Sequence, residues 1–430
     1  MKYSDQELAD WADIASARVL FGDCMEKMKE LDDCSIDAIV CDPPYGMSPD
    51  GVARTWADIE EGRKIGGFMG KGWDAAVPCH NFFSECFRVL KHGGHLIAFS
   101  STRTVFALGM ACQKGGFELR DQILWCYFSG FPKSHDISKA IDKEAGAARE
   151  VVGYDDDFLR RNPNNTGIGT GEIYNRAKKS ELAGTITKPA TKEAQRWSGF
   201  GTALKPAVEP ALLARKPLEK GLTIAQNVLK HGTGALNIDA CRFGYGDPCW
   251  VGPNTEKMGD GGQHRINKGG RTLYGPIGPH ESIGGHPQGR WPANLYQCAK
   301  ASRSEREAGL SHLKAKSGAD AVQRKEGSAG MDNPRAGAGR TADEVKNFHP
   351  TVKPLKLMRW CCRLIGGQKG SVILDPFGGS GTTGAAAILE GFDCILIERE
   401  AEYLPIIQGR LRWARQEYKR ENAQLKLFND

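Results

Sequence analysis

The chain has 430 residues, more than one typical domain, so we expect a catalytic core that carries one or two substantial insertions. Its 58 Lys and Arg residues against 52 Asp and Glu residues give a formal net charge of +6, which permits nucleic-acid binding without establishing it. No apolar run approaches the roughly 18 residues that cross a bilayer, and acidic residues occupy the start, so we expect a cytoplasmic protein without a membrane partner.

The 13 cysteines are dispersed along the chain, and many lie within apolar runs. Disulfide scaffolds are typical of short secreted chains, so these cysteines are predicted to be reduced and mostly buried. The nearest approaches to a metal-ligand pattern are the adjacent pair Cys361 and Cys362 and the wide pair Cys241 and Cys249. Neither has the CxxC spacing of a zinc site, and we expect no bound metal.

Short β-branched runs alternate with amphipathic stretches over the first 130 residues and about the last 80. Seven strands are predicted, at residues 18–23, 36–42, 95–100, 118–128, 211–214, 371–377 and 392–398. Helices are predicted at residues 82–91, 382–391 and 403–419. This alternation indicates an α/β protein with a doubly wound, seven-stranded sheet, whose ligands bind beyond the carboxyl ends of the strands.

The middle of the chain, residues 131–348, is rich in Gly, Pro, Asn, Lys and Arg and has little apolar periodicity. Its apolar run at residues 211–214 is bounded by Pro210 and Pro217 and is predicted to be a core strand. We therefore expect five parts: core at 1–130, insertion at 131–204, core strand at 205–217, insertion at 218–348 and core at 349–430. Both loop-rich insertions are candidates for target recognition.

The predicted strand at residues 36–42 leads into the tetrapeptide Asp42-Pro43-Pro44-Tyr45. The two prolines stiffen the turn and remove two N–H donors, which leaves the Asp42 carboxylate and the Pro43 carbonyl as acceptors in fixed directions. Such acceptors could hold the exocyclic amine of a base with its lone pair aimed at an electrophilic methyl group. Tyr45 offers a face for stacking a base extruded from the duplex. An isolated tetrapeptide of this type can also be a plain turn.

A second strand end runs into a glycine-rich turn and an alanine-rich helix, with the sequence Asp375-Pro376-Phe377-Gly378-Gly379-Ser380-Gly381-Thr382-Thr383. Glycines let the backbone approach a ligand, and the unpaired N–H groups of a helix start favour a carboxylate or phosphate. The next strand ends in Glu398, about twenty residues downstream, where this architecture places an acid on ribose hydroxyls. The turn lacks the GxxxxGK[ST] pattern, so nucleoside triphosphate chemistry is disfavoured. A tight turn without a ligand is the alternative.

These motifs together resemble the β-group of bacterial and phage DNA amino-methyltransferases, in which the catalytic motif precedes the cofactor motif. Here the order is DPPY at 42–45, HPTVKP at 349–354 and DPFGGSGTT at 375–383. The stretch before the tetrapeptide is also similar to the family's amino-terminal signature. The resemblance covers residues 18–130, 205–217 and 349–415.

The resemblance implies the fold of S-adenosylmethionine-dependent methyltransferases and roles for the tetrapeptide. Asp42, with the Pro43 carbonyl beside it, would bind the target amine, and Tyr45 would stack on the flipped base. Members with Asp in the first motif position usually methylate adenine N6, whereas Ser there usually marks cytosine N4. Adenine N6 is therefore the expected target, with cytosine N4 as the alternative.

The resemblance also implies the cofactor S-adenosylmethionine and its contacts. Its methionine part would lie in the turn at residues 375–383 and its ribose at Glu398. The remaining residues implied to lie beside the cofactor are Asp23 and Cys24 at its adenine, and Thr351 and Lys353 of the HPTVKP motif.

Cations and an aromatic side chain follow the tetrapeptide among glycines, at Arg54, Lys71 and Trp73. Phosphate-contacting cations with a mobile aromatic residue suit a lid that closes over DNA around a flipped base. The second insertion has similar candidates at Arg265, Lys268 and Arg271. For each of them, a solvated charged loop is the alternative interpretation.

Other substrates and classes remain open. RNA or a protein glutamine could replace DNA, but the glutamine enzymes characteristically have Asn ahead of Pro-Pro-Tyr, so Asp42 argues against them. A non-catalytic DNA-binding relic of the fold is disfavoured by the intact motifs. Double-stranded DNA is the expected partner, and a homodimer and a cognate restriction enzyme stay open.

Overall fold

A computed structural model describes residues 17–46, 77–130, 134–155, 185–244, 247–249, 265–267, 270–272, 275–277, 280–282, 289–316 and 345–429. The chain divides into two compact units. Unit 1 comprises residues 1–128 and 208–430, and unit 2 comprises residues 129–207.

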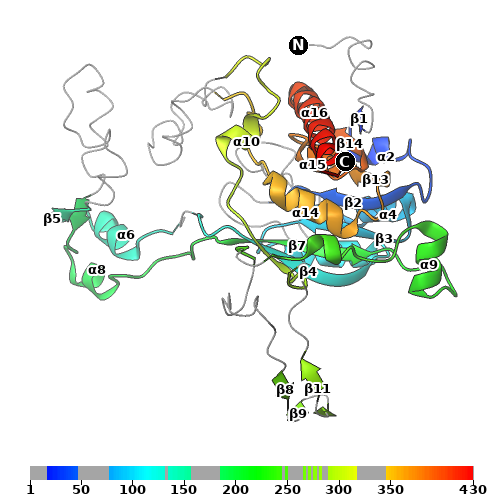
Figure 1. Ribbon diagram of the computed structural model, residues 1–430. Coiled ribbons are helices and arrows are strands. Elements are labelled where there is room, and N and C mark those ends of the chain that lie inside the picture. The colour runs from blue at the N-terminus through cyan, green and yellow to red at the C-terminus, as the bar shows by residue number, and fades with distance from the viewer. Residues whose placement is uncertain are drawn as a thin grey trace. The chain divides into compact units, whose positions relative to one another are not determined.

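An eight-stranded sheet forms the centre of unit 1, in the order β1-β14-β13-β2-β3-β7-β4-β12 (Figure 1). Its strands are β1 (Ala17–Phe21), β2 (Ile36–Cys41), β3 (Leu90–Phe99), β4 (Glu118–Cys126), β7 (Val208–Arg215), β12 (Leu295–Gln297), β13 (Val372–Asp375) and β14 (Asp393–Glu398). All neighbouring strands are parallel except β7, which is antiparallel to both β3 and β4. The protein thus has the predicted α/β fold with a mostly parallel central sheet.

The sheet has one strand more than the seven predicted, and this strand lies within the range 218–348 that was predicted to be an insertion. In β12, Leu295 pairs with Leu124 of β4. The buried ring of Tyr296 lies 5.1 Å from the ring of Trp360, measured between centroids. A three-residue strand is too short to give an alternating pattern, which is why the sequence did not reveal it. This part of the range belongs to the core.

Helices cover both faces of the sheet because successive residues of a strand point to opposite sides. Val40 and Ile97 pack into one cluster with helices α14 (Leu355–Ile365) and α15 (Thr382–Leu389). Their chain neighbours Ile39 and Leu96 pack into a second cluster with three helices, α2 (Cys24–Met28), α4 (His80–Val89) and α5 (Val105–Lys114).

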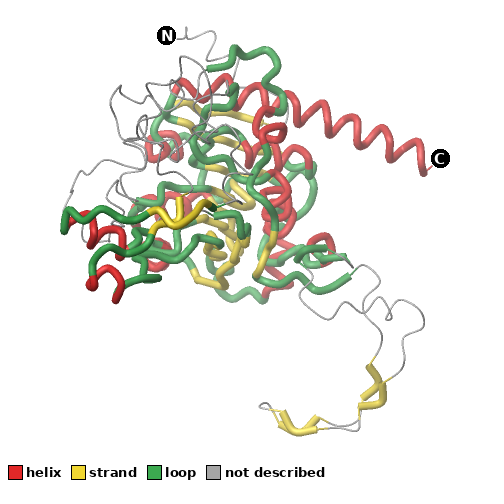
Figure 2. Tube along the Cα trace, turned by 90° about the vertical axis from the view of Figure 1, so that its left-hand side faces the viewer, coloured by secondary structure: helices red, strands yellow, loops and turns green. Residues whose placement is uncertain are grey.

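The last helix, α16 (Leu404–Asn429), packs against α15 and follows a 3₁₀ turn at Ala401–Tyr403. Figure 2 shows it as one continuous helix leading to the carboxyl terminus. It ends about ten residues beyond the position predicted from the sequence. Within the described ranges, no helix combines the length and apolarity needed to span a bilayer.

The remaining described elements of unit 1 belong to the range between β7 and α14. In the sequence, two helices, α9 (Ile224–His231) and α10 (Arg303–Glu307), stand before and after two short antiparallel strand pairs. Those pairs join β8 (Arg265–Asn267) to β11 (His280–Ser282), and β9 (Gly270–Thr272) to β10 (Gly275–Ile277).

Unit 2 pairs β5 (Val151–Tyr154) antiparallel to β6 (Thr185–Thr187) and adds helices α6 (Ile137–Glu144) and α8 (Lys192–Arg196). The buried carboxylate of Asp142 holds these parts together. It accepts hydrogen bonds from the Arg149 guanidinium at 2.6 Å and from the Thr191 hydroxyl at 2.8 Å. Because each partner comes from a different segment, this one carboxylate organises much of the small unit.

Candidate functional site

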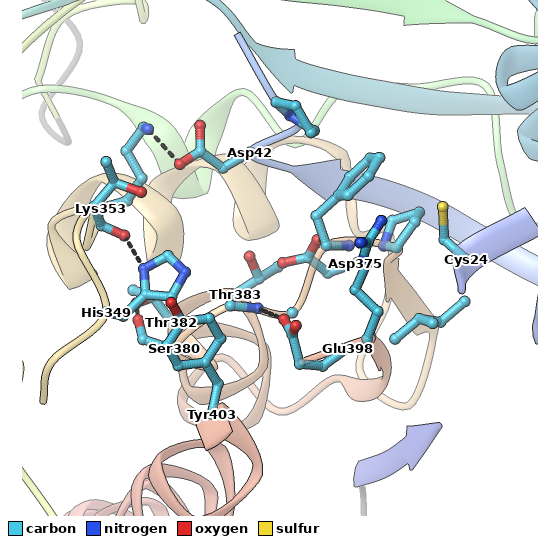
Figure 3. A pocket seen from close by; sticks show the side chains of 18 of the residues that line it. Cys24, Asp42, His349, Lys353, Asp375, Ser380, Thr382, Thr383, Glu398 and Tyr403 are labelled. Atoms are coloured by element: carbon cyan, nitrogen blue, oxygen red, sulfur yellow. Dashed lines mark hydrogen bonds and ion pairs between the residues drawn. The ribbon is translucent and has the colours of Figure 1, made fainter. Parts of the chain in front are cut away.

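A pocket lies where four neighbouring parallel strands, β1, β14, β13 and β2, reach their carboxyl ends. Parallel strands end at the same edge of a sheet, so the turns that follow them converge there. The pocket is lined by Gly22, Asp23, Cys24, Asp42, Pro44, His349, Thr351, Lys353, Met358, Asp375, Pro376, Phe377, Gly378, Gly379, Ser380, Thr382, Thr383, Ile397, Glu398, Arg399 and Tyr403. Figure 3 shows how Asp42, Asp375 and Glu398 surround it from different strands.

The pocket gathers most of the residues predicted for catalysis and cofactor binding. The exceptions are Pro43, Tyr45 and Gly381, which are absent from its lining. Pro43 is buried in the turn after β2, and the Tyr45 hydroxyl contacts Lys353, which does line the pocket. Gly381 is the residue from which α15 starts.

The glycine-rich turn is held in shape by the strand beside it. Glu398 accepts a hydrogen bond from the Gly379 amide at 2.6 Å through one carboxylate oxygen, and from the Glu400 amide at 2.8 Å through the other. Gly379 has φ +52° and Gly381 has φ +74°, values that favour glycine. Each Glu398 oxygen therefore has a fixed direction and a lone pair left for a ligand hydroxyl.

Arg410 of α16 supports the same glycine-rich turn through hydrogen bonds to its hydroxyl side chains. Its fully buried guanidinium donates to the Ser380 hydroxyl at 3.1 Å and to the Thr382 hydroxyl at 3.0 Å. Burial lowers the pKa of Arg410 to about 10. This role of Arg410 was not predicted, because an arginine on an amphipathic helix usually faces solvent.

Two further pocket segments carry predicted cofactor residues. Asp23 caps α2, since its side chain accepts a hydrogen bond from the Met25 amide at 2.9 Å. Burial raises the pKa of the neighbouring Cys24 thiol to about 12, so this side chain is neutral. A capped helix start and an uncharged thiol provide a fixed, weakly polar wall.

The HPTVKP segment packs across the glycine-rich turn. His349 Nδ1 donates a hydrogen bond of 2.6 Å to the Thr351 carbonyl. The His349 ring also packs edge-on against the Tyr403 ring, with 4.6 Å between their centroids. A Cβ added to Gly379 would lie 3.1 Å from His349 Nε2. The sequence singled out Thr351 and Lys353 of this segment but not His349, which the fold brings against the turn.

Asp375 and Glu398 are buried acids at the pocket. Burial raises the pKa of Asp375 to about 8, although hydrogen bonds from Thr383 and the Phe377 amide oppose the shift. Burial likewise raises the pKa of Glu398 to about 7 against the hydrogen bonds from its backbone donors. Near pH 7, Asp375 is therefore mostly neutral, whereas Glu398 is about half ionised.

We expect the ligand-free protein to lose stability as the pH rises from about 4 to about 8. A raised carboxyl pKa means that the folded chain binds more protons than the unfolded chain in this window, so the free energy of unfolding falls with pH. Asp375→Asn should flatten this dependence. Urea unfolding near pH 5 and near pH 8 measures both slopes, and identical slopes in the two proteins would contradict the assignment.

A charged cluster lies at the other end of the pocket, around Asp42 (Figure 3). The Lys353 ammonium lies 2.6 Å from Asp42 Oδ2 and donates to the Tyr45 hydroxyl at 3.0 Å. The Tyr45 hydroxyl donates in turn to Glu209 Oε2 at 3.2 Å. Burial, followed by the charges of Asp42 and Glu209, raises the pKa of Tyr45 well above its usual range, so the phenol stays neutral.

One oxygen of Asp42 is left open. Asp42 Oδ1 is buried and has no hydrogen-bond partner among the residues that the structure describes. A buried acceptor without a donor is costly, so a ligand donor at this point would be favoured. The Asp42 end of the pocket can therefore hold a ligand that offers an N–H group.

Most of the predicted DNA contacts lie outside the part of the chain that the structure describes. Arg54, Lys71, Trp73 and Lys268 fall outside the described residues. Arg265 begins β8 and Arg271 lies in β9, and their role on DNA stays a prediction. The 13 cysteines are free, and within the described ranges no group of three or more His, Cys, Asp or Glu could hold a metal ion.

The chain shares sequence with characterised DNA methyltransferases. Type II methyltransferase M.HindIII of Haemophilus influenzae is 26% identical over 240 residues, which are 50% of this chain and 63% of the relative. Type II methyltransferase M.HinfI of the same species is 32% identical over 113 residues, 25% of this chain and 30% of the relative. DNA adenine methyltransferase YhdJ of Escherichia coli is 42% identical over 113 residues, 26% and 33% of the two chains. Each match thus spans less than two thirds of the relative.

Among solved structures, the cytosine-N4-specific PvuII DNA methyltransferase aligns over 94% of this chain and 92% of its own, with a TM-score of 0.42 and 13% identity. The complex of M1.HpyAVI with S-adenosylmethionine aligns over 92% and 99%, with a TM-score of 0.37 and 14% identity. A family model described as DNA methylase, of the N6/N4 type, matches residues 36–409. Because this match spans most of the chain and both motifs, the protein belongs to the N6/N4 DNA methylase family.

Proposed function

We propose that this protein is a site-specific DNA methyltransferase that transfers a methyl group from S-adenosylmethionine to the exocyclic N6 of adenine after base flipping. The observation that carries the proposal is the buried, open Asp42 Oδ1 beside the pocket. In a member of the N6/N4 DNA methylase family, such an acceptor suits the amine of a base.

The residues of the pocket fit S-adenosylmethionine. Glycines line the pocket at Gly378 and Gly379, and a Cβ added to Gly379 would enter the gap to the His349 ring, which also lines it. Glu398 has a carboxylate placed for ribose hydroxyls, and the start of α15 offers backbone N–H groups to the carboxylate of the methionine part. When bound, the cofactor supplies an electrophilic methyl group.

The chain's own residues would prepare the amine for attack. Asp42 Oδ1 and the Pro43 carbonyl accept its two hydrogens, which favours the geometry in which the nitrogen lone pair points at the methyl carbon. The nitrogen–methyl bond forms as the methyl–sulfur bond breaks, and the amine loses one proton. Asp42 Oδ1 is an acceptor through which that proton can leave. Tyr45 stacks on the extruded base.

Adenine is the favoured base because Asp occupies the first position of the tetrapeptide, and because one relative, YhdJ, is a DNA adenine methyltransferase. The partner is double-stranded DNA, and the ranges 131–204 and 218–348, apart from the core strand β12, are the candidates for target recognition. A homodimer, a cognate restriction enzyme and a cytoplasmic location stay predictions.

We expect DNA from a host that expresses this protein to contain N6-methyladenine at one short recognition sequence. Sequencing with modification detection measures the base, the atom and the sequence together, and a host expressing Asp42→Ala is the matched control. Cytosine-N4 methylation at one sequence would overturn the base assignment alone. DNA without any new modification, from a host containing folded protein, would favour the non-catalytic relic.

A further inference from the structure

Glu209 belongs to none of the three motifs, yet it reaches the catalytic tetrapeptide. It lies near the start of β7, the antiparallel strand, opposite Trp125 of β4. Its side chain is only 18% exposed. Oε2 lies 3.4 Å from the Lys353 ammonium and accepts a hydrogen bond from the Tyr45 hydroxyl. The cluster thus draws on β7, the turn after β2 and the HPTVKP segment, which are far apart in the sequence.

Lys353 is enclosed by charge and by aromatic rings. Its side chain is 7% exposed, and the ammonium lies 5.1 Å from the ring centroid of Phe99 and 5.2 Å from that of Tyr45. Burial alone would lower its pKa, but the carboxylates of Asp42 and Glu209 outweigh burial and raise it. A charged ammonium therefore sits between two carboxylates, at the hydroxyl end of Tyr45 and within cation–π distance of the Phe99 ring.

Resting on the proposed function, we propose that Lys353 and Glu209 are positioning residues for methyl transfer: Lys353 fixes Asp42 with Oδ1 open to the target amine, and Glu209 shares the ammonium. Lys353 ties down Asp42 Oδ2 at 2.6 Å, which leaves one direction for the free oxygen. This role differs from the cofactor contact that the family resemblance implies for Lys353.

Glu209 has an electrostatic purpose in this arrangement. The amine becomes positive in the transition state and is stabilised there by nearby negative charge. If the Lys353 ammonium were paired with Asp42 alone, it would cancel the negative charge of the Asp42 carboxylate. With Glu209 present, two carboxylates share the buried Lys353 ammonium, which leaves one net negative charge among the buried groups. The Lys300 ammonium near the other oxygen of Glu209 is half exposed, so solvent and salt screen its charge. Stabilising charge that develops only in the transition state raises the rate rather than the affinity for DNA. Glu209 also holds the Tyr45 hydroxyl, and hence the ring on which the base would stack.

The test compares Glu209→Gln and Lys353→Met with Lys300→Met. Lys300 is the matched control because its exposed ammonium lies 3.6 Å from the other oxygen of Glu209, Oε1, outside the cluster. Single-turnover methyl transfer at saturating DNA and cofactor should slow by about tenfold in Glu209→Gln, which removes the negative charge but keeps an acceptor oxygen for the Tyr45 hydroxyl. Lys353→Met should slow it at least as much, while Lys300→Met keeps the wild-type rate.

Two readouts separate positioning from a purely structural role. Calorimetric affinity for S-adenosylmethionine should stay within about twofold of wild type in both cluster variants, because in this arrangement both side chains act on Asp42 and Tyr45 and not on the cofactor. Affinity for DNA should likewise stay within about twofold of wild type while the single-turnover rate falls, since the proposed contact acts on charge that develops only in the transition state.

An unchanged rate in folded Glu209→Gln would overturn the inference, even if Lys353→Met fails to fold. Loss of S-adenosylmethionine affinity in folded Lys353→Met would also overturn it, by making Lys353 a cofactor ligand. In both cases an active wild-type enzyme leaves the proposed function standing. A folded wild-type protein that methylates no DNA would overturn the proposed function and this inference together.

Discussion

Asp42→Ala is expected to slow methyl transfer by on the order of 10²- to 10³-fold, while the affinity for S-adenosylmethionine stays nearly unchanged. In the proposed mechanism the carboxylate presents its open oxygen to the amine and not to the cofactor, so its loss removes an interaction made most strongly in the transition state. Single-turnover rates with radiolabelled cofactor, together with calorimetric binding, measure the two quantities separately.

Asp37→Asn is the matched control for Asp42→Ala. Asp37 lies on the same strand, β2, and is also paired with a lysine, at 2.6 Å from Lys91. Its other oxygen accepts the Val372 amide at 2.8 Å, so the change should cost stability and leave the rate per folded molecule unaltered. Near-normal turnover in purified, folded Asp42→Ala would remove the tetrapeptide from the chemistry.

The parts of the fold that follow local rules could be predicted from the sequence. β-Branched runs placed seven of the eight strands, and the glycine-rich turn and the proline pair were identified from their unusual backbone requirements. β12 has only three residues and so carries no alternating pattern. Helices α5 and α14 were not predicted, although both pack against the sheet.

The site was predictable only as far as its motifs. Asp42 could be placed because it follows a strand and Glu398 because it ends one, whereas the partners of Asp42 depend on contacts between distant segments. Tyr45 and Glu209 are separated by 164 positions, and Tyr45 and Lys353 by 308. No local pattern marks which of many glutamates or lysines will meet a given tyrosine, so the charged cluster required the fold.

Gly379→Val is expected to reduce the affinity for S-adenosylmethionine by at least on the order of 10²-fold, which corresponds to about 3 kcal/mol. Two physical effects act together. The backbone φ of +52° is unfavourable for a β-branched residue, and the new Cβ would lie 3.1 Å from His349 Nε2, in the gap between the turn and the HPTVKP segment. Titration calorimetry with the cofactor measures the loss directly.

Gly370→Val separates the two effects because it carries backbone strain alone. Gly370 has φ +83°, and a Cβ there would meet no atom within 4 Å. It precedes β13, whereas Gly379 follows that strand and lines the pocket. Gly370→Val should therefore lower the melting temperature while the folded protein keeps wild-type affinity. If Gly379→Val remained folded and bound the cofactor as tightly as Gly370→Val does, the glycine-rich turn would be a structural connection and the cofactor would have to bind elsewhere along the strand ends.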